Sequence, residues 1–128
     1  MAGPQPKKQT DFEPEEIQNY LARVRKFIEE DNYIIPVHEN RQKNKRFMED
    51  YKINTRREKE IIAGLTYEDF CYAVNNEKEE YSHETLYVFC KELELNYFGE
   101  KKKVEVYLKF NLIDTEDNKK LIVVSFHE

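Results

Sequence analysis

The chain has 128 residues, a length typical of one compact domain. Its net charge of −5 argues against a protein that coats nucleic acid through charge alone. Two cysteines form neither a disulfide framework nor a metal site, and no apolar run approaches the roughly 20 residues of a membrane helix. With 13% aromatic and 37% charged residues, we expect a small aromatic core under a charged surface. Because no apolar run is long enough for a membrane helix, we expect the protein in the cytoplasm.

The N-terminal part of the chain predicts a lead segment and then a helix. Residues 1–10 contain two prolines and no hydrophobic pattern, so we expect a disordered lead before a single domain over residues 11–128. Pro14 suits the first turn of a helix, which we expect to end near Asp31 and Asn32. The apolar stripe of this helix consists of Ile17, Tyr20, Leu21, Val24, Phe27 and Ile28.

Two further helices are expected before residue 66. Residues 33–35 predict a short strand stopped by Pro36, after which Asn40 can cap a helix. The apolar side of that helix consists of Phe47, Met48 and Tyr51. Asn54 or Thr55 can begin the next helix, which Gly64 ends. Its inward residues are Ile61, Ile62 and Leu65, and the segment after it starts with a capping pattern from Thr66 to Asp69.

The C-terminal part predicts strands. Residues 74–83 are polar and indicate a surface loop, residues 84–95 a strand, and residues 96–101 a turn. Alternating apolar residues over 104–112 and 121–127 predict two strands joined as a hairpin. The predicted class is therefore α+β, with N-terminal helices packed on one face of a C-terminal antiparallel sheet.

The hydrophobic pattern also selects the register of the hairpin. The preferred register pairs Leu108 with Phe126, Phe110 with Val124, Leu112 with Ile122, and Asp114 with Lys120 near the turn. A slip of one residue would place Val106 beside His127, so it is the poorer choice. In the preferred register, the face turned away from the core carries Tyr107 opposite His127 and Lys109 opposite Ser125. This patch is the candidate site.

Basic residues form two clusters on an acidic chain. The first contains Arg41, Lys43, Lys45 and Arg46, and the second Lys101, Lys102 and Lys103. The first cluster can equally bind a polyanion or form a solvated helix face. For the second cluster, a solvated surface is the more common case. The sequence shows no metal-ligand spacing and no glycine-rich phosphate loop, so we expect neither a metal nor another cofactor.

Four blocks in order resemble the MqsR family of type II toxins. They are GLTYEDFCYA (64–73), LYVF (86–89), VYLK (106–109) and LIVVSFHE (121–128), and the match extends over roughly residues 60–128. Members of this family have a RelE-like fold, cut messenger RNA and are held inactive by an antitoxin encoded beside them. The resemblance thus implies single-stranded mRNA and an antitoxin as partners, and it leaves open whether a ribosome is needed.

The site residues of the family are only partly present. The tyrosine of the VYLK block is Tyr107, whereas His127 stands where the best-known branch has a lysine. Tyr72 replaces another lysine, Val88 replaces a glutamine, and Tyr87 occupies the position of a tryptophan. Because the side-chain chemistry differs at these positions, activity or cleavage preference can differ from that of the family.

Cleavage of RNA through its 2′-hydroxyl needs a base, an acid and stabilisation of the charge on phosphorus. We assign His127 as general acid or base, Tyr107 as orienting or acid group, and Lys109 as electrostatic stabiliser. Contacts to RNA are expected from Arg41, Lys43, Arg46, Tyr72 and Tyr87. A second interpretation remains open: a non-catalytic module that binds protein or nucleic acid on the same scaffold, with His127 an ordinary surface residue.

Overall fold

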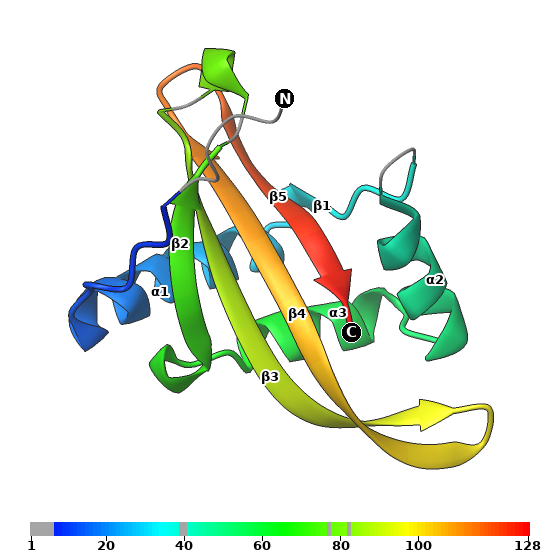
Figure 1. Cartoon of the computed structure of the whole chain (residues 1–128). Helices are drawn as coiled ribbons and strands as arrows, with labels where there is room; N and C mark the ends of the chain where they lie inside the picture. Colours follow the sequence, from blue (N-terminus) through cyan, green and yellow to red (C-terminus); the bar gives the residue numbers. More distant parts are fainter. Residues whose placement is uncertain (1–6, 39–40, 77, 82) are drawn as a thin grey trace, which may run out of the picture.

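We describe a computed structural model of the chain, which covers residues 7–38, 41–76, 78–81 and 83–128 (Figure 1). Three α-helices precede most of the sheet: α1 (Pro14–Glu29), α2 (Gln42–Asp50) and α3 (Thr55–Ala63). The strands are β1 (Tyr33–Ile34), β2 (Phe70–Asn75), β3 (Thr85–Tyr97), β4 (Glu100–Asp114) and β5 (Lys119–His127). Two 3-10 turns, η2 (Tyr67–Asp69) and η3 (Glu79–Tyr81), flank β2. The predicted α+β class, with helices first and the sheet after them, is confirmed.

The five strands form one sheet in the order β1-β5-β4-β3-β2. The strands β2 to β5 are antiparallel to their neighbours, whereas β1 pairs with β5 in parallel, through Tyr33 with Leu121 and Ile34 with Ile122. The sheet is therefore mixed, and the short predicted strand at residues 33–35 forms its edge. The hairpin of β3 and β4 extends beyond the other strands (Figure 1).

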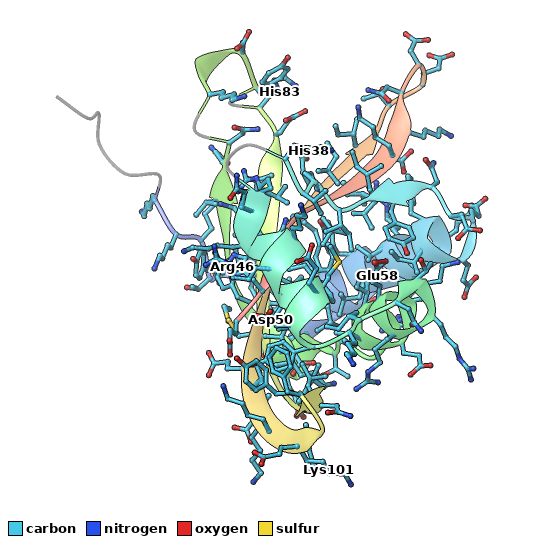
Figure 2. All side chains as sticks on the ribbon, turned by 90° about the vertical axis from the view of Figure 1, so that its right-hand side faces the viewer. His38, Arg46, Asp50, Glu58, His83 and Lys101 are labelled. Carbon is cyan, nitrogen blue, oxygen red and sulfur yellow. The ribbon has the colours of Figure 1, made fainter. Side chains whose placement is uncertain are left out.

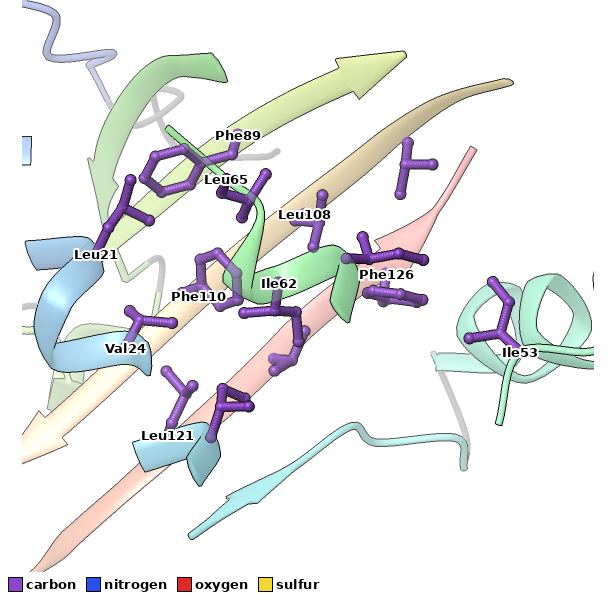
Figure 3. Packing of buried hydrophobic residues seen from close by; sticks show 14 of the residues in the cluster. Leu21, Val24, Ile53, Ile62, Leu65, Phe89, Leu108, Phe110, Leu121 and Phe126 are labelled. Carbon is purple, nitrogen blue, oxygen red and sulfur yellow. The ribbon is translucent and has the colours of Figure 1, made fainter. Parts of the chain in front are cut away.

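The helices cover one face of the sheet only. In Figure 1, α1 and α3 lie behind the strands, while α2 lies at the side, next to the β5 edge. Leu21 and Val24 of α1 and Ile62 of α3 pack against Phe110 and Leu108 of β4 (Figure 3). These side chains are at most 1% exposed, so this helix-covered face holds the core.

Of the two predicted helix caps, the one for α3 can be checked in the structure and the one for α2 cannot. Asn54 caps α3 as predicted, because its side-chain oxygen accepts a hydrogen bond of 2.8 Å from the main-chain N–H of Arg57. Gly64 ends this helix. The proposed cap of α2, Asn40, lies outside the described residues, and α2 begins at Gln42.

The register of the β4–β5 hairpin is correct at one end and wrong at the other. Leu108 pairs with Phe126 as predicted, but Phe110 pairs with Val123 and not with Val124. Val124 is thus the extra residue of a β-bulge, which the alternation alone does not indicate. The pairs beyond the bulge are shifted by one residue: Leu112 with Leu121, and Asp114 with Lys119.

The bulge changes which side chains of β5 enter the core. Leu121 and Val123 are fully buried on the covered face, whereas Ile122 and Val124 lie on the opposite face, where they border a cleft. Four consecutive apolar residues at this place satisfy either register, so the sequence pattern could not decide between them.

The structure adds strand residues and an N-terminal contact that the sequence did not predict. Residues 70–75, which had no assigned strand, form β2, and β3 continues to Tyr97. Residues 1–6 of the expected lead lie outside the described residues, and Gln9 exchanges two main-chain hydrogen bonds with Ala73, of 2.7 and 2.8 Å. No helix in the described ranges is long and apolar enough to cross a membrane.

Candidate functional site

The patch on the uncovered face is centred on Tyr107 and His127. The register pairs Tyr107 with His127 and Lys109 with Ser125, as the sequence predicted, because the bulge begins only after Lys109. The two rings of Tyr107 and His127 are stacked, with centroids 5.6 Å apart and planes at 27°. Both residues are partly buried, so each keeps some contact with solvent.

Tyr72 from β2 completes this arrangement. Its phenol oxygen lies 3.3 Å from that of Tyr107, within hydrogen-bonding distance. A second bulge, between Phe70 and Tyr72, turns Tyr72 toward the uncovered face, where it pairs with Val88. The structure therefore brings Tyr72 into contact with the predicted site, across two strands from His127.

The environment of Tyr107 fixes its protonation state. Burial raises the pKa of Tyr107 above its ordinary value, and the hydrogen bond and charge of Tyr72 raise it further. At neutral pH Tyr107 is therefore a neutral phenol. A neutral phenol donates a hydrogen bond or a proton and does not act as a base.

His127 is oriented by the main chain of the residue that follows it. Its Nδ1 lies 3.0 Å from the main-chain oxygen of Glu128. In the tautomer that donates this hydrogen bond, Nε2 carries the free lone pair and can accept a proton. The Glu128 side chain in turn accepts a hydrogen bond of 3.1 Å from the Tyr51 hydroxyl, which links the end of β5 to the end of α2.

A buried asparagine places α2 beside the site. Asn44 is 1% exposed. Its side chain forms hydrogen bonds with the main-chain groups of β5 that lie beyond the end of the short β1 strand. Its Nδ2 donates to the carbonyls of Pro36 (2.9 Å) and Val124 (3.1 Å), and its Oδ1 accepts from the N–H of Phe126 (2.8 Å). Because these bonds replace a missing strand partner, the basic helix is held next to His127.

Two of the predicted cations border a hollow that includes His127. Lys43 and Arg46 of α2 line this hollow of about 140 Å³ together with Phe47, Asp50, Tyr51 and Glu128. Arg46 and Asp50 lie on the outward side of α2 (Figure 2). The hollow thus places two cations, Lys43 and Arg46, and two carboxylates, Asp50 and Glu128, beside the imidazole.

The other two predicted cations border a larger cleft on the same face. Arg41 and Lys109 line a cleft of about 660 Å³ that runs from the β1 edge to the segment between β2 and β3. Lys78 and Lys120 also line it. Lys109 makes no ion pair with any residue that the structure describes, so its charge is available to a ligand.

Tyr87 does not join the site. It lies on the helix-covered face, where its ring stacks on that of Tyr20 at 3.9 Å and contacts Phe12. Tyr87 therefore lies on the face opposite to the patch, because β3 turns Tyr87 and Val88 to opposite sides of the sheet. Val88 lies on the uncovered face, but it is fully buried.

The second basic cluster lies on the β3–β4 hairpin, and one of its lysines approaches the hollow beside His127. Lys102 lies over the ring of Tyr97 at 4.9 Å, and Tyr97 contacts Tyr51, which borders that hollow. Lys101 to Lys103 follow the turn of the β3–β4 hairpin, and Figure 2 shows Lys101 at the opposite end of the molecule from His38 and His83. No group of three or more His, Cys, Asp or Glu side chains suited to a metal ion occurs within the described residues.

Three residues of the site were not identified from the sequence. Asn44 had a usable signal, because it lies at helical spacing on the stripe of Phe47 and Tyr51, where a polar residue must find partners. Glu84 and Asn111 line the large cleft and had no such sequence signal. The hydrogen bond between them depends on the path of the segment between β2 and β3.

A scan of protein-family models and a search of curated proteins both find no match to this sequence. The interpretation of the site therefore depends on its geometry and on the four sequence blocks that resemble MqsR toxins.

Proposed function

We propose that this protein is an endoribonuclease of the MqsR toxin type, which cuts single-stranded mRNA by attack of a 2′-hydroxyl and is bound by an antitoxin. The observation that carries the proposal is the stacked pair of Tyr107 and His127, with Lys109 one step along β4 on the same face. The cationic helix α2 beside it supports the binding of a polyanion.

Each group has one role in the proposed reaction. Nε2 of His127 takes the proton of the 2′-hydroxyl, whose oxygen then bonds to phosphorus. Lys109 stabilises the negative charge that develops on the phosphorane oxygens. The bond from phosphorus to the 5′-oxygen breaks, and the neutral phenol of Tyr107 gives its proton to that oxygen. The products are a 2′,3′-cyclic phosphate and a 5′-hydroxyl.

Tyr72 has a supporting role in this proposal. Its hydroxyl lies 3.3 Å from that of Tyr107 and can donate a hydrogen bond to the phenolate that forms when Tyr107 gives up its proton. After product release, water protonates Tyr107 and accepts the proton held by His127, which restores both groups. Lys43 and Arg46 hold the phosphate next to the reacting one, because they share the hollow with His127.

One observation favours a second candidate function, a non-catalytic binding module. Val88 is apolar and fully buried at the position where the resembling family has a glutamine, so it cannot donate a hydrogen bond to the substrate. A module of this kind would bind RNA or a protein over the same face without cutting.

The test is cleavage of a defined RNA in EDTA by the wild type, His127→Ala and the control His83→Ala, whose exposed side chain lies outside the patch. We expect His127→Ala to lower the cleavage rate by about 10²–10⁴-fold, with His83→Ala unchanged. Wild-type products should end in a cyclic phosphate. Equal cleavage by all three proteins would contradict the assignment, and RNA that is bound but uncut would establish the binding module.

A further inference from the structure

Cys90 lies on the uncovered face, beside the proposed site. It stands directly opposite Tyr107 in the pairing of β3 with β4. Cross-strand partners project to the same face of a sheet, with Cβ atoms about 4.5–5.5 Å apart. Cys90 therefore flanks Tyr107 on one side, as His127 flanks it on the other.

A bulge in β2 brings the second cysteine to the first. The register of β2 with β3 shifts between Phe70 and Tyr72, so Cys71 is the extra residue of this bulge. Burial raises the pKa of Cys90 to about 12, and its hydrogen bond with the Cys71 thiol contributes to that value. Both side chains are free thiols and partly exposed. The bulge thus creates a pair of neighbouring thiols that small molecules can reach.

The thiol pair belongs to the same cluster as two phenols. Tyr72 follows Cys71 directly in the chain, and its hydroxyl lies 3.3 Å from that of Tyr107. The pKa of Tyr107 is raised mainly by burial and by Tyr72, and the charges of Cys90 and Cys71 add to the effect. A change at the thiols can therefore reach Tyr107 both from β3 and through the neighbouring Tyr72.

The bulge also bears on whether the two sulfurs can bond. On regular strands Cys71 and Cys90 would be diagonal neighbours about 7–8 Å apart, whereas the Cα atoms of a disulfide lie about 4.4–6.8 Å apart. Bond formation therefore has to draw Cys71 toward β3. The extra residue of a bulge has no partner of its own in the ladder, so Cys71 can move without the loss of a strand pair.

We propose that Cys71 and Cys90 are a reversible oxidation site, at which a peroxide joins the two thiols in a disulfide. Cys90 is a neutral thiol at physiological pH, so the sulfur of Cys71 attacks the peroxide, becomes a sulfenic acid and releases one water. The sulfur of Cys90 then displaces the sulfenic oxygen as a second water. The peroxide gains two electrons, the thiols lose two hydrogen atoms, and a dithiol reductant reverses the step.

The disulfide should act on RNA cleavage through Tyr72, a consequence that rests on the proposed function. Movement of Cys71 toward β3 shifts Tyr72, the next residue, from its contact with the Tyr107 hydroxyl. The phenolate that forms on Tyr107 then lacks its hydrogen-bond donor. Cleavage should slow by about 10–100-fold, which corresponds to one hydrogen bond to a charged group.

The first test measures the disulfide without RNA. Because the chain contains two cysteines, an internal disulfide can join only Cys71 to Cys90. The folded protein is treated with hydrogen peroxide, and we expect mass spectrometry to show a loss of two hydrogen atoms that dithiothreitol restores. The NMR signals of the Tyr72 and Tyr107 rings should move on oxidation of the wild type.

The matched control is Cys71→Ser, which keeps one thiol and cannot form the internal bond. Its Tyr107 signal and its RNA cleavage rate should not respond to peroxide, whereas the wild type should lose cleavage on oxidation and regain it with dithiothreitol. If Cys71→Ser does not fold, Cys90→Ala removes the other sulfur and serves the same purpose. The mass measurement on the wild type needs neither variant.

Two results would overturn the inference. Thiols that stay reduced, or disulfides that join two copies of the chain, would exclude the site and leave the ribonuclease proposal intact. An internal disulfide that moves neither the Tyr107 signal nor the cleavage rate would remove its link to the candidate site. If the disulfide forms and Tyr107 responds but the wild type cuts no RNA in either state, the oxidation site stands and the proposed function fails.

Discussion

The two faces of the sheet use the same strands for opposite purposes. On the covered face, β4 presents Leu108 and Phe110, which are fully buried under α1 and α3. On the other face the same strand presents Tyr107, Lys109 and Asn111, and no helix of the described chain crosses it (Figure 1). Alternation along a strand thus separates the core from the candidate site at the spacing of one residue.

The comparison also explains why the uncovered face is not flat. Asn44 and Asn111 are almost fully buried polar residues. Asn44 of α2 forms hydrogen bonds with β5, and Asn111 of β4 donates a hydrogen bond to Glu84 in the segment between β2 and β3. These bonds hold α2 on one side and the segment between β2 and β3 on the other. The face is therefore a cleft with polar walls, in contrast to the apolar interior behind it.

Substitution of adjacent residues on β4 should give the largest contrast. Phe110→Ala leaves a cavity in the covered face and should lower the free energy of unfolding by about 3–5 kcal/mol. Lys109→Ala should leave that free energy nearly unchanged but lower RNA cleavage by about 100-fold or more. Denaturant unfolding and cleavage rates, measured on both variants, check these values.

The pair serves as its own control, since each variant tests the face that the other leaves intact. A loss of stability in Lys109→Ala as large as that in Phe110→Ala would show that the uncovered face is part of the core. The distinction between the two faces would then fail.

Removal of the bond that joins α2 to the sheet should have an intermediate effect. Asn44→Ala leaves the buried N–H of Phe126 and the carbonyl of Val124 without their partner, which should cost about 1–3 kcal/mol of unfolding free energy. Cleavage should also fall, because Lys43 and Arg46 lose their fixed position. Asn19→Ala, at an exposed position of α1, is the matched control, and equal behaviour of the two variants would contradict the role of Asn44.

How far the sequence predicts this molecule depends on the range of the interactions. The cap of α3 by Asn54 and the register of Tyr107 with His127 follow from local patterns, and both were predicted correctly. The bulge at Val124 was not, because the apolar run on β5 fits two registers and only tertiary packing selects one. The separation of Tyr87 from the patch was not predicted for a related reason, since nothing local indicates which side of β3 the helices cover.

A change of one cation should have a smaller effect, visible in the salt dependence. Arg46→Gln removes one charge from the hollow beside His127. For an uncleavable RNA, the slope of log affinity against log salt concentration should become shallower by about 0.7, the value for one phosphate contact on a single strand. Arg56→Gln, on α3 and paired with Glu60, should leave the slope unchanged, and equal slopes for both variants would exclude Arg46 from the RNA path.

The smallest effect concerns the pH dependence of stability on the covered side. Burial raises the pKa of Tyr33 to about 12, and the charge of Glu58 and its hydrogen bond of 3.1 Å with the Tyr33 hydroxyl contribute. Because the folded pKa exceeds the unfolded one, this contribution is complete below about pH 10 and is lost as pH rises toward about 12.

Tyr33→Phe should therefore unfold with a shallower loss of stability over that alkaline range than the wild type. Denaturant unfolding at several pH values measures the two slopes, with Tyr67→Phe as the control for loss of a more exposed phenol. Parallel slopes for the wild type and Tyr33→Phe would contradict the environment assigned to Tyr33.

The central claim, that the uncovered face binds RNA, is tested most directly by mapping the contact on the wild-type protein. An isotope-labelled sample is titrated with an uncleavable single-stranded RNA, and the NMR signals that move are placed on the structure. We predict shifts at Tyr107, Lys109, Asn111 and His127, with the signals of α1 unchanged. Shifts confined to α1 or to the tip of the β3–β4 hairpin would contradict the claim.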